Sequence, residues 1–255
     1  MKRLWALAAN TFREAVRDRV LYSILFFAVG ILVLSLALKE ITIGDQAKVV
    51  RSVAQGSIDL FGSIIAMFLG VSLVWKEIER KTVYTILSKP IPRWMFVLGK
   101  YLGLVMTIGV EVAILLALYC GLMVLEQQFP PAIVFVSVAM MMVKLMLLCA
   151  WATLFSTYST PMTAAAFTLA VFTIGNLADD IWLFGSQAEN PAVQQISHVL
   201  YWALPNFELF NLRAYAVHER PIPWDQVGPA TAYGLLYTVA VLGLAMAVFQ
   251  RRDLR

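Results

Sequence analysis

Six long runs of apolar residues dominate this 255-residue sequence. The hydrocarbon core of a bilayer is about 30 Å thick, so a crossing helix needs roughly 20 mostly apolar residues. The runs are residues 20–38, 57–75, 95–125, 132–155, 162–177 and 228–249. They predict an all-α membrane protein with six transmembrane helices in a single transmembrane domain, residues 1–255.

Composition excludes the other broad classes of protein. Hydrophobic residues make up 60% of the chain and charged residues 14%, against roughly 25% charged residues in a soluble domain. A soluble fold of this size could not hide so much apolar surface, and a disordered chain would be poor in it. The net charge of +4 comes without a basic stripe interleaved with aromatic residues, so no nucleic-acid partner is expected. Membrane lipid is therefore the expected surrounding.

Residues 3–19 precede the first apolar run and are predicted to form an amphipathic helix. Arg13, Glu14 and Arg17 interrupt the segment, which excludes a cleavable signal peptide. Apolar residues at helical spacing share one side: Leu4, Trp5, Ala8, Phe12, Ala15 and Val16. This pattern is typical of an interfacial helix lying in the headgroup plane. A cytosolic extension of the first crossing helix is the alternative.

The placement of basic residues predicts the orientation. Six crossings put both ends of the chain on one side, and that side also receives residues 76–93. Most of the 20 lysine and arginine residues lie there. Because cytoplasmic loops are enriched in Lys and Arg, we expect a multi-pass protein of a cytoplasmic membrane with both termini in the cytoplasm.

Residues 77–93, between the second and third crossings, form the longest polar cytoplasmic segment. A cluster of charged residues follows the end of the second crossing, and an apolar ridge of Val83, Ile86 and Leu87 comes next at helical spacing. Pro90 and Pro92 then end the helix, because proline lacks the amide donor and clashes with the preceding turn. A short surface helix of this kind is suited to a groove on another protein. An ordinary solvated loop is the alternative.

Two ionisable residues lie deep within predicted crossings. Glu111 in the third and Lys144 in the fourth stand at similar depths on either side of the external turn. An unpaired charge there costs roughly 2.5 kcal/mol or more. We therefore hypothesise a Glu111–Lys144 ion pair, either structural or part of a substrate site. No catalytic or metal-binding motif accompanies it.

Four polar motifs separate the apolar runs in a fixed order. The first motif is Phe12-Arg13-Glu14-Ala15-x-Arg17-Asp18-Arg19, and the second is Glu77-x-Glu79-Arg80-Lys81-Thr82 followed by Ile86-Leu87-Ser88-Lys89-Pro90-Ile91-Pro92-Arg93. The third motif is Phe155-Ser156-Thr157-x-Ser159-Thr160-Pro161. The fourth motif is Leu204-Pro205-Asn206-Phe207-Glu208-x-Phe210-Asn211. With these motifs, the chain resembles a permease subunit of the type-2 ABC exporter family.

This resemblance implies an architecture. Residues 3–19 would be an elbow helix, and residues 77–93 a coupling helix that seats in a cytosolic ABC ATPase. Residues 191–217 would be a re-entrant helical hairpin on the external side. The coupling contacts would be made by seven residues: Glu77, Glu79, Arg80, Lys81, Val83, Ile86 and Leu87.

The resemblance also implies which functions belong to other subunits of the transporter. A second permease copy, identical or a close paralogue, would complete the pathway in a bacterial or archaeal inner membrane. The chain lacks a phosphate-binding loop, because its single Gly-Lys pair, Gly99-Lys100, has neither the preceding glycine nor the following Ser or Thr. We therefore expect no cofactor and no enzyme activity in this chain, with ATP and Mg²⁺ bound by the partner ATPase.

The leading interpretation is thus the membrane permease of an ATP-driven exporter. An intramembrane enzyme would need a cluster of ionisable groups at one depth, for which Glu111 and Lys144 are the candidates. A non-transporting membrane assembly protein is the third alternative, although it gives residues 77–93 no purpose. The apolar and small residues of the crossings do not specify a substrate.

Overall fold

The computed structural model describes residues 2–41, 46–79, 92–125, 127 and 129–251. All regular structure in these residues is helical, which confirms the all-α prediction. The helices are α1 (Lys2–Val16), α2 (Arg19–Ile41), α3 (Gln46–Glu79), α5 (Arg93–Leu125), α6 (Ala132–Tyr158), α7 (Pro161–Asn176), α8 (Ala178–Gln187), α9 (Pro191–Ala203), the 3-10 turn η1 (Glu208–Phe210), α10 (Arg213–Val217) and α11 (Trp224–Arg251).

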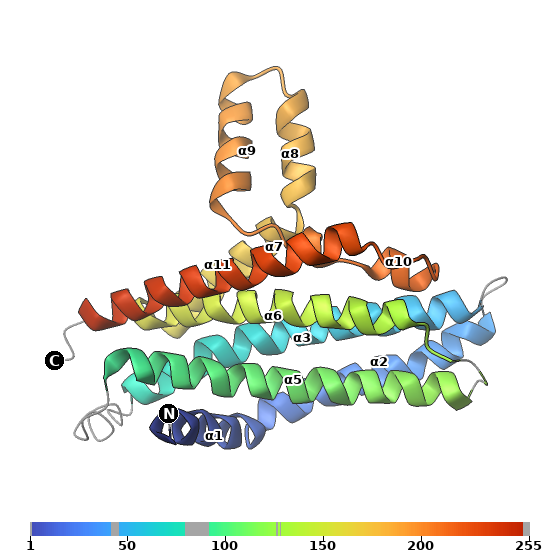
Figure 1. Ribbon diagram of the computed structural model, residues 1–255, viewed down its shortest axis with the longest axis horizontal. Helices are drawn as coiled ribbons and strands as arrows, with labels where there is room; N and C mark the ends of the chain where they lie inside the picture. The colour runs from blue at the N-terminus through green and yellow to red at the C-terminus, as the bar shows by residue number, and fades with distance from the viewer. Residues whose placement is uncertain (1, 42–45, 80–91, 126, 128, 252–255) are drawn as a thin grey trace.

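The long helices form a bundle whose axes run in roughly the same direction (Figure 1). Four of them, α3, α5, α6 and α11, are long and apolar enough to cross a membrane. Two pairs of helices, α1 with α2 and α7 with α8, are each bent by 63° at a short break. If each bent pair counts as one span, two further crossings are possible. The described residues thus contain four to six candidate spans, and the six predicted runs agree with the upper value.

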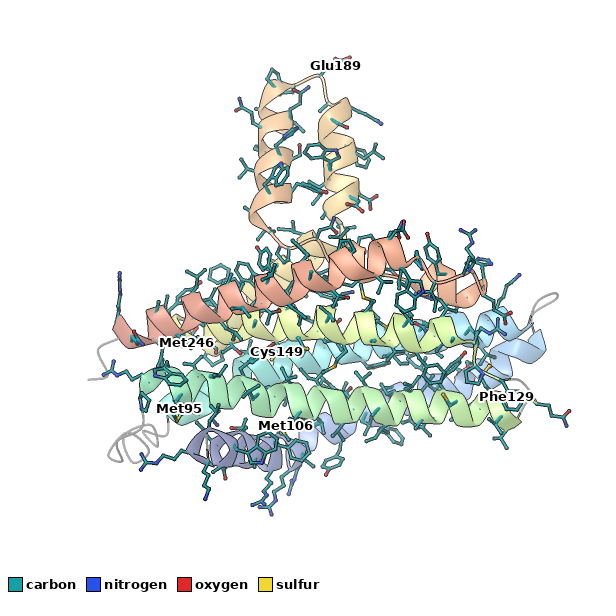
Figure 2. All side chains as sticks on the ribbon, viewed as in Figure 1. Met95, Met106, Phe129, Cys149, Glu189 and Met246 are labelled. Carbon is teal, nitrogen blue, oxygen red and sulfur yellow. The ribbon has the colours of Figure 1, made fainter. Side chains whose placement is uncertain are left out.

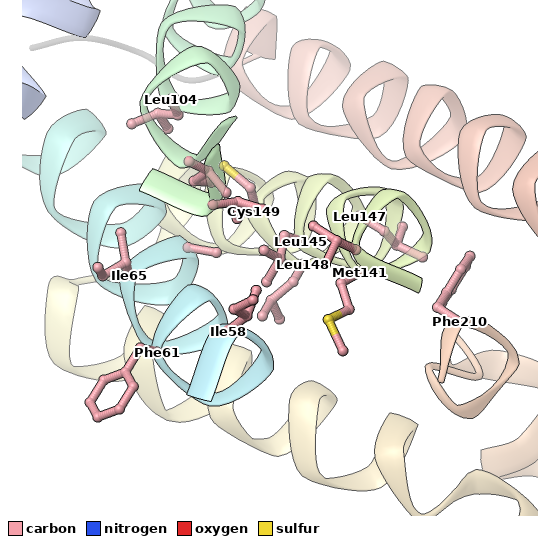
Figure 3. Close-up of a cluster of buried hydrophobic side chains, with 14 of the residues drawn as sticks. Ile58, Phe61, Ile65, Leu104, Met141, Leu145, Leu147, Leu148, Cys149 and Phe210 are labelled. Carbon is pink, nitrogen blue, oxygen red and sulfur yellow. The ribbon is translucent and has the colours of Figure 1, made fainter. Parts of the chain in front are cut away.

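Helix α6 lies at the centre of the bundle and packs against α3 on one side and α11 on another. Small residues on α3 allow a close approach: a Cβ at Gly62 would lie 2.9 Å from Leu145, and one at Gly70 would overlap the Cβ of Ala152. Close backbone approach gives extensive van der Waals contact, which drives helix association in lipid. Figure 3 shows side chains of α3 and α6 within the resulting apolar cluster.

Helix α1 packs along the beginning of α5. Ala8, Thr11 and Ala15 are its buried residues, whereas Trp5 is 64% exposed. The face of α1 that contacts α5 is therefore rotated about the helix axis relative to the predicted apolar side. The glycines of α5 leave room for small side chains but not for the indole of Trp5.

Helices α8 and α9 form a hairpin that projects sideways from the bundle (Figure 1). A Cβ at Gly185 would overlap Ser197, and the Trp182 ring lies 4.4 Å from the ring of His198. Figure 2 shows Glu189 at the tip of the hairpin and Cys149 within the bundle. The hairpin begins at Ala178, earlier than the predicted segment 191–217, and Asp179 in the first turn of α8 favours a helix start there.

Candidate functional site

A polar cluster lies inside the bundle around Lys144 of α6. Its Nζ donates to both carboxylate oxygens of Asp59 on α3, at 2.9 and 3.0 Å, and to Oδ1 of Asn176 on α7, at 2.8 Å. The ammonium group also lies 5.4 Å from the centre of the Phe172 ring. Lys144 is 3% exposed. A lysine ammonium has three donor hydrogens, and these acceptors compensate for its removal from water.

Helix geometry explains why these three side chains meet. Asn176 is the last residue of α7, and its Nδ2 donates to the Phe172 carbonyl, which fixes the amide with Oδ1 available to Lys144. Asp59 lies 13 residues after the start of α3, about 20 Å along the helix. It therefore lies near the middle of the candidate span Lys48–Val71, whereas the predicted run 57–75 places it near the start of a crossing.

The predicted Glu111–Lys144 ion pair is wrong. Lys144 pairs with Asp59, and among the described residues neither carboxylate oxygen of Glu111 has a hydrogen-bond partner. Depth along a helix follows from residue number, but rotation about its axis decides which side chains meet. Glu111 lies on the buried face of α5 with Ile108 and Leu115, while Lys144 turns toward α3 and α7.

A second polar group surrounds Asn206, in the segment that joins α9 to η1. Its Nδ2 donates to Asp179 at 2.7 Å, and its Oδ1 accepts from the backbone amide of Glu208 at 2.9 Å. Phe207 follows and packs at Gly175, where its backbone amide donates to the Gly175 carbonyl. The Leu204–Asn211 motif thus folds against the break between α7 and α8.

A cavity of about 520 Å³ opens beside this segment. Its polar lining comes from Asp179, Glu208, Asn211, Gln226 and Tyr233. Burial raises the pKa of Glu208, while a hydrogen bond from Asn211 and the charge of Lys144 lower it. The cavity therefore holds a carboxyl group that retains its proton more readily than a solvated glutamate.

We expect this shift to make stability depend on pH. Folding raises the pKa of Glu208, so the folded protein binds this proton more tightly than the unfolded chain does. The resulting stabilisation of the folded state is fully present below the unfolded pKa of about 4.3, and it is lost as pH rises through the folded pKa. The Glu208→Gln variant should thus gain stability relative to the unsubstituted protein as pH rises. Thermal unfolding of both proteins across pH 4–8 would measure this, and a constant difference would contradict it.

The structure describes the flanks of the predicted coupling segment but little of the segment itself. Glu77 and Glu79 lie in the last turns of α3, and Arg80, Lys81, Val83, Ile86 and Leu87 lie outside the described residues. On the far side, Arg93 donates to the Gln250 carbonyl at 3.0 Å, and the Phe96 and Phe249 rings stack at 5.5 Å. The start of α5 is thereby joined to the end of α11.

The described residues offer no group of three His, Cys, Asp or Glu side chains that could hold a metal ion. Glu111 and Lys144, the candidates for an intramembrane enzyme, do not form one site. Two polar clusters that the described residues do assemble lie around Lys144 and Asn206.

Comparison with known families identifies the class. The profile of the ABC-2 family transporter proteins matches residues 5–254. The chain belongs to this family and is a membrane-spanning transport permease, the membrane component of a transporter. Members of this family in general work with an ABC ATPase. A search of curated proteins finds no significant match to this chain.

Proposed function

We propose that this chain is the permease subunit of an ABC exporter in which a separate cytosolic ATPase drives substrate out of the cell. The observation that carries the proposal is the family match over residues 5–254. In this assignment, the chain binds no cofactor, and ATP and Mg²⁺ belong to the ATPase. Two permease copies, identical or paralogous, enclose the pathway in an inner membrane, with both termini in the cytoplasm.

The lengths of the flanking helices support a coupling role for residues 77–93. Helix α3 has 34 residues and α5 has 33, so each is about 50 Å long at 1.5 Å per residue. This exceeds the hydrocarbon thickness of about 30 Å. The two helices can therefore carry the segment beyond the bilayer to a cytosolic partner.

The contacts at this end of the bundle suggest how motion would pass inward. Arg93 and Phe96 join α5 to α11, and Lys100 forms an ion pair with Glu14 of α1 at 3.4 Å. A displacement of the coupling segment by the ATPase would thus move α1, α5 and α11 together. In this proposal, α1 is the elbow helix, and α10, from the predicted external segment 191–217, lies at the external end of the bundle.

Substitution of the apolar ridge tests the proposal. We expect Ile86→Asp with Leu87→Asp to abolish copurification of an ABC ATPase, because two carboxylates would be buried without partners in its groove. Ile86→Val with Leu87→Met is the matched control, since it retains an apolar ridge of similar volume, and it should keep the ATPase bound.

Two outcomes would contradict the coupling role. One is an ATPase that remains bound to the Asp variant at the level of the control. The other is labelling of a cysteine at position 86 by a membrane-impermeant reagent applied from outside intact cells, because that segment would then face the external medium.

A further inference from the structure

The α8–α9 hairpin is attached near the middle of the bundle rather than at one end. Its first helix follows Asn176, which accepts a hydrogen bond from Lys144, and Lys144 lies near the middle of the 27 residues of α6. The chain that leaves its second helix returns to the same place, because the Phe207 amide donates to the Gly175 carbonyl. Both ends of the hairpin are therefore held at the level where the candidate span α6 is half crossed, and the hairpin projects sideways from there (Figure 1).

The surface of the hairpin combines exposed apolar and charged side chains. A groove of about 710 Å³ lies between α8 and α9. Two of the side chains that line it are largely exposed, Phe184 at 78% and Ile196 at 61%. The carboxylates of Asp180 and Glu189 are also on exposed residues, and residues 145–212 contain no lysine or arginine that could pair with them. Apolar side chains accompanied by polar groups are typical of a protein interface.

Neither lipid nor water suits this surface. At the level of the hydrocarbon core, a charged side chain on a helix costs roughly 2.5–3.5 kcal/mol, so Asp180 and Glu189 disfavour lipid around the hairpin. In water, the side chains of Phe184 and Ile196 would stay uncovered, and an exposed apolar patch marks a site of interaction. Another protein surface is therefore the expected cover of the hairpin.

The size of the hairpin indicates which protein surface covers it. Helices α8 and α9 have 10 and 13 residues, so they are about 15 and 20 Å long and each about 10 Å wide. One face of the pair thus offers about 350 Å². A partner that covers this face once would bury about 700 Å² in total, below the roughly 1,200–2,000 Å² of a stable interface. Two copies that each give and receive a hairpin about a twofold axis double the buried area to about 1,400 Å².

We propose that the α8–α9 hairpin packs against a second copy of this chain, in a dimer with a twofold axis. Each copy contributes its hairpin to the other, and the exposed side chains of Phe184 and Ile196 lie within the contact. The contact surrounds the carboxylates of Asp180 and Glu189 with protein and trapped water instead of lipid. Polar groups at this level of a membrane protein require such surroundings.

The contact assigns different surroundings to the two sides of the bundle. The hairpin side faces the second copy, whereas α5 lies on the opposite side in Figure 1 and faces lipid. Val110, Ile114 and Leu118 follow one another at four-residue spacing on α5 and are 38–45% exposed, which makes an apolar stripe suited to lipid. The presence of two permease copies rests on the proposed function, but the contact depends on neither the ATPase nor the substrate.

Photo-crosslinking of the full-length chain in membranes tests the contact. Phe184 is replaced by p-benzoylphenylalanine, whose ketone reacts on illumination with neighbouring C–H bonds. We expect a covalent product of two copies of this chain, identified by mass spectrometry of its peptides. Ile114 of α5 is the matched control position, because it is 40% exposed on the helix opposite the hairpin. The same replacement there should give no product of two copies.

The association of purified chains tests the apolar part of the contact. Phe184→Gln combined with Ile196→Gln should weaken dimerisation by about tenfold or more, because both side chains lie within the contact. Light scattering in a mild detergent measures the number of copies at each concentration. Both residues are exposed in the single chain, so the variant should keep its far-UV circular dichroism. Ile114→Gln is the matched control and should leave dimerisation unchanged.

Three results would overturn the proposal. The first is a product at position 184 that contains lipid or another polypeptide but no second copy. The second is a product of two copies that forms equally at position 114, and the third is unchanged dimerisation of the Phe184→Gln, Ile196→Gln variant. Each would reject the hairpin contact without rejecting the proposed function, whose failure would appear separately as the absence of an ABC ATPase from the purified complex.

Discussion

Replacing Lys144 with methionine should lower the stability of the purified permease more than any other single substitution considered. The change leaves the Asp59 carboxylate without the ammonium group that lies 2.9 Å away. Removing one partner of a buried ion pair costs roughly 3–5 kcal/mol. Because the Asp59 side chain is 34% exposed, we expect the lower value, about 3 kcal/mol. For a chain of this size, that corresponds to a fall in Tm of roughly 6–12 °C, measurable by circular dichroism.

A double-mutant cycle separates the ion pair from general damage to the core. Asp59→Asn combined with Lys144→Met removes both charges, so the double variant should recover much of the stability lost by Lys144→Met. Lys2→Met is the control for loss of a positive charge, since Lys2 is exposed at the start of α1. A double variant no more stable than Lys144→Met would show that Asp59 and Lys144 are not coupled.

A side chain at Gly103 should detach α1 from α5. A Cβ there would lie 2.5 Å from the Cβ of Thr11 and 2.6 Å from the backbone oxygen of Ala8. The Ala8 oxygen belongs to the helix backbone and cannot rotate away, so the two helices must separate. Overpacking of this kind costs about 1–3 kcal/mol, and separation would also break the Lys100–Glu14 ion pair.

Limited proteolysis measures this effect directly. In Gly103→Val, trypsin should cleave after Arg13 and Arg17 several-fold faster, and the Tm should fall. Gly121→Ala on the same helix is the matched control, because nothing lies within 4 Å of a Cβ at that position and alanine favours a helix over glycine. Equal cleavage rates in the two variants would contradict the close α1–α5 contact.

Much of the fold could be predicted because apolar length is a property of the chain itself. Each of the four long crossing helices contains one of the predicted runs. The run 162–177 predicted α7 to within one residue at each end, but the runs did not predict that α8 would form half of the hairpin. The break between α7 and α8 lies where the Pro205–Phe207 segment packs at Gly175, a contact between residues far apart in sequence.

The candidate site was less predictable. The sequence identified Lys144 and Glu111 as intramembrane charges but paired them with each other, and it treated Asp59 as lying near the start of a crossing. The four-residue spacing of Arg51, Gln55, Asp59 and Ser63 was visible in the sequence. It was missed because a polar row lowers the apolar character by which a crossing is recognised.

The sequence alone determined that this chain is a helical protein of the lipid bilayer, because its continuous apolar runs are long enough to cross as helices, which satisfy their own backbone away from water. It also placed Glu111 and Lys144 within crossing helices, in agreement with the candidate spans α5 and α6. The tertiary structure alone decided that Lys144 meets Asp59 and that, among the described residues, the Glu111 carboxylate accepts no hydrogen bond. Those contacts depend on the rotation of each helix about its axis, which is set where Gly62 and Gly70 of α3 pack against α6.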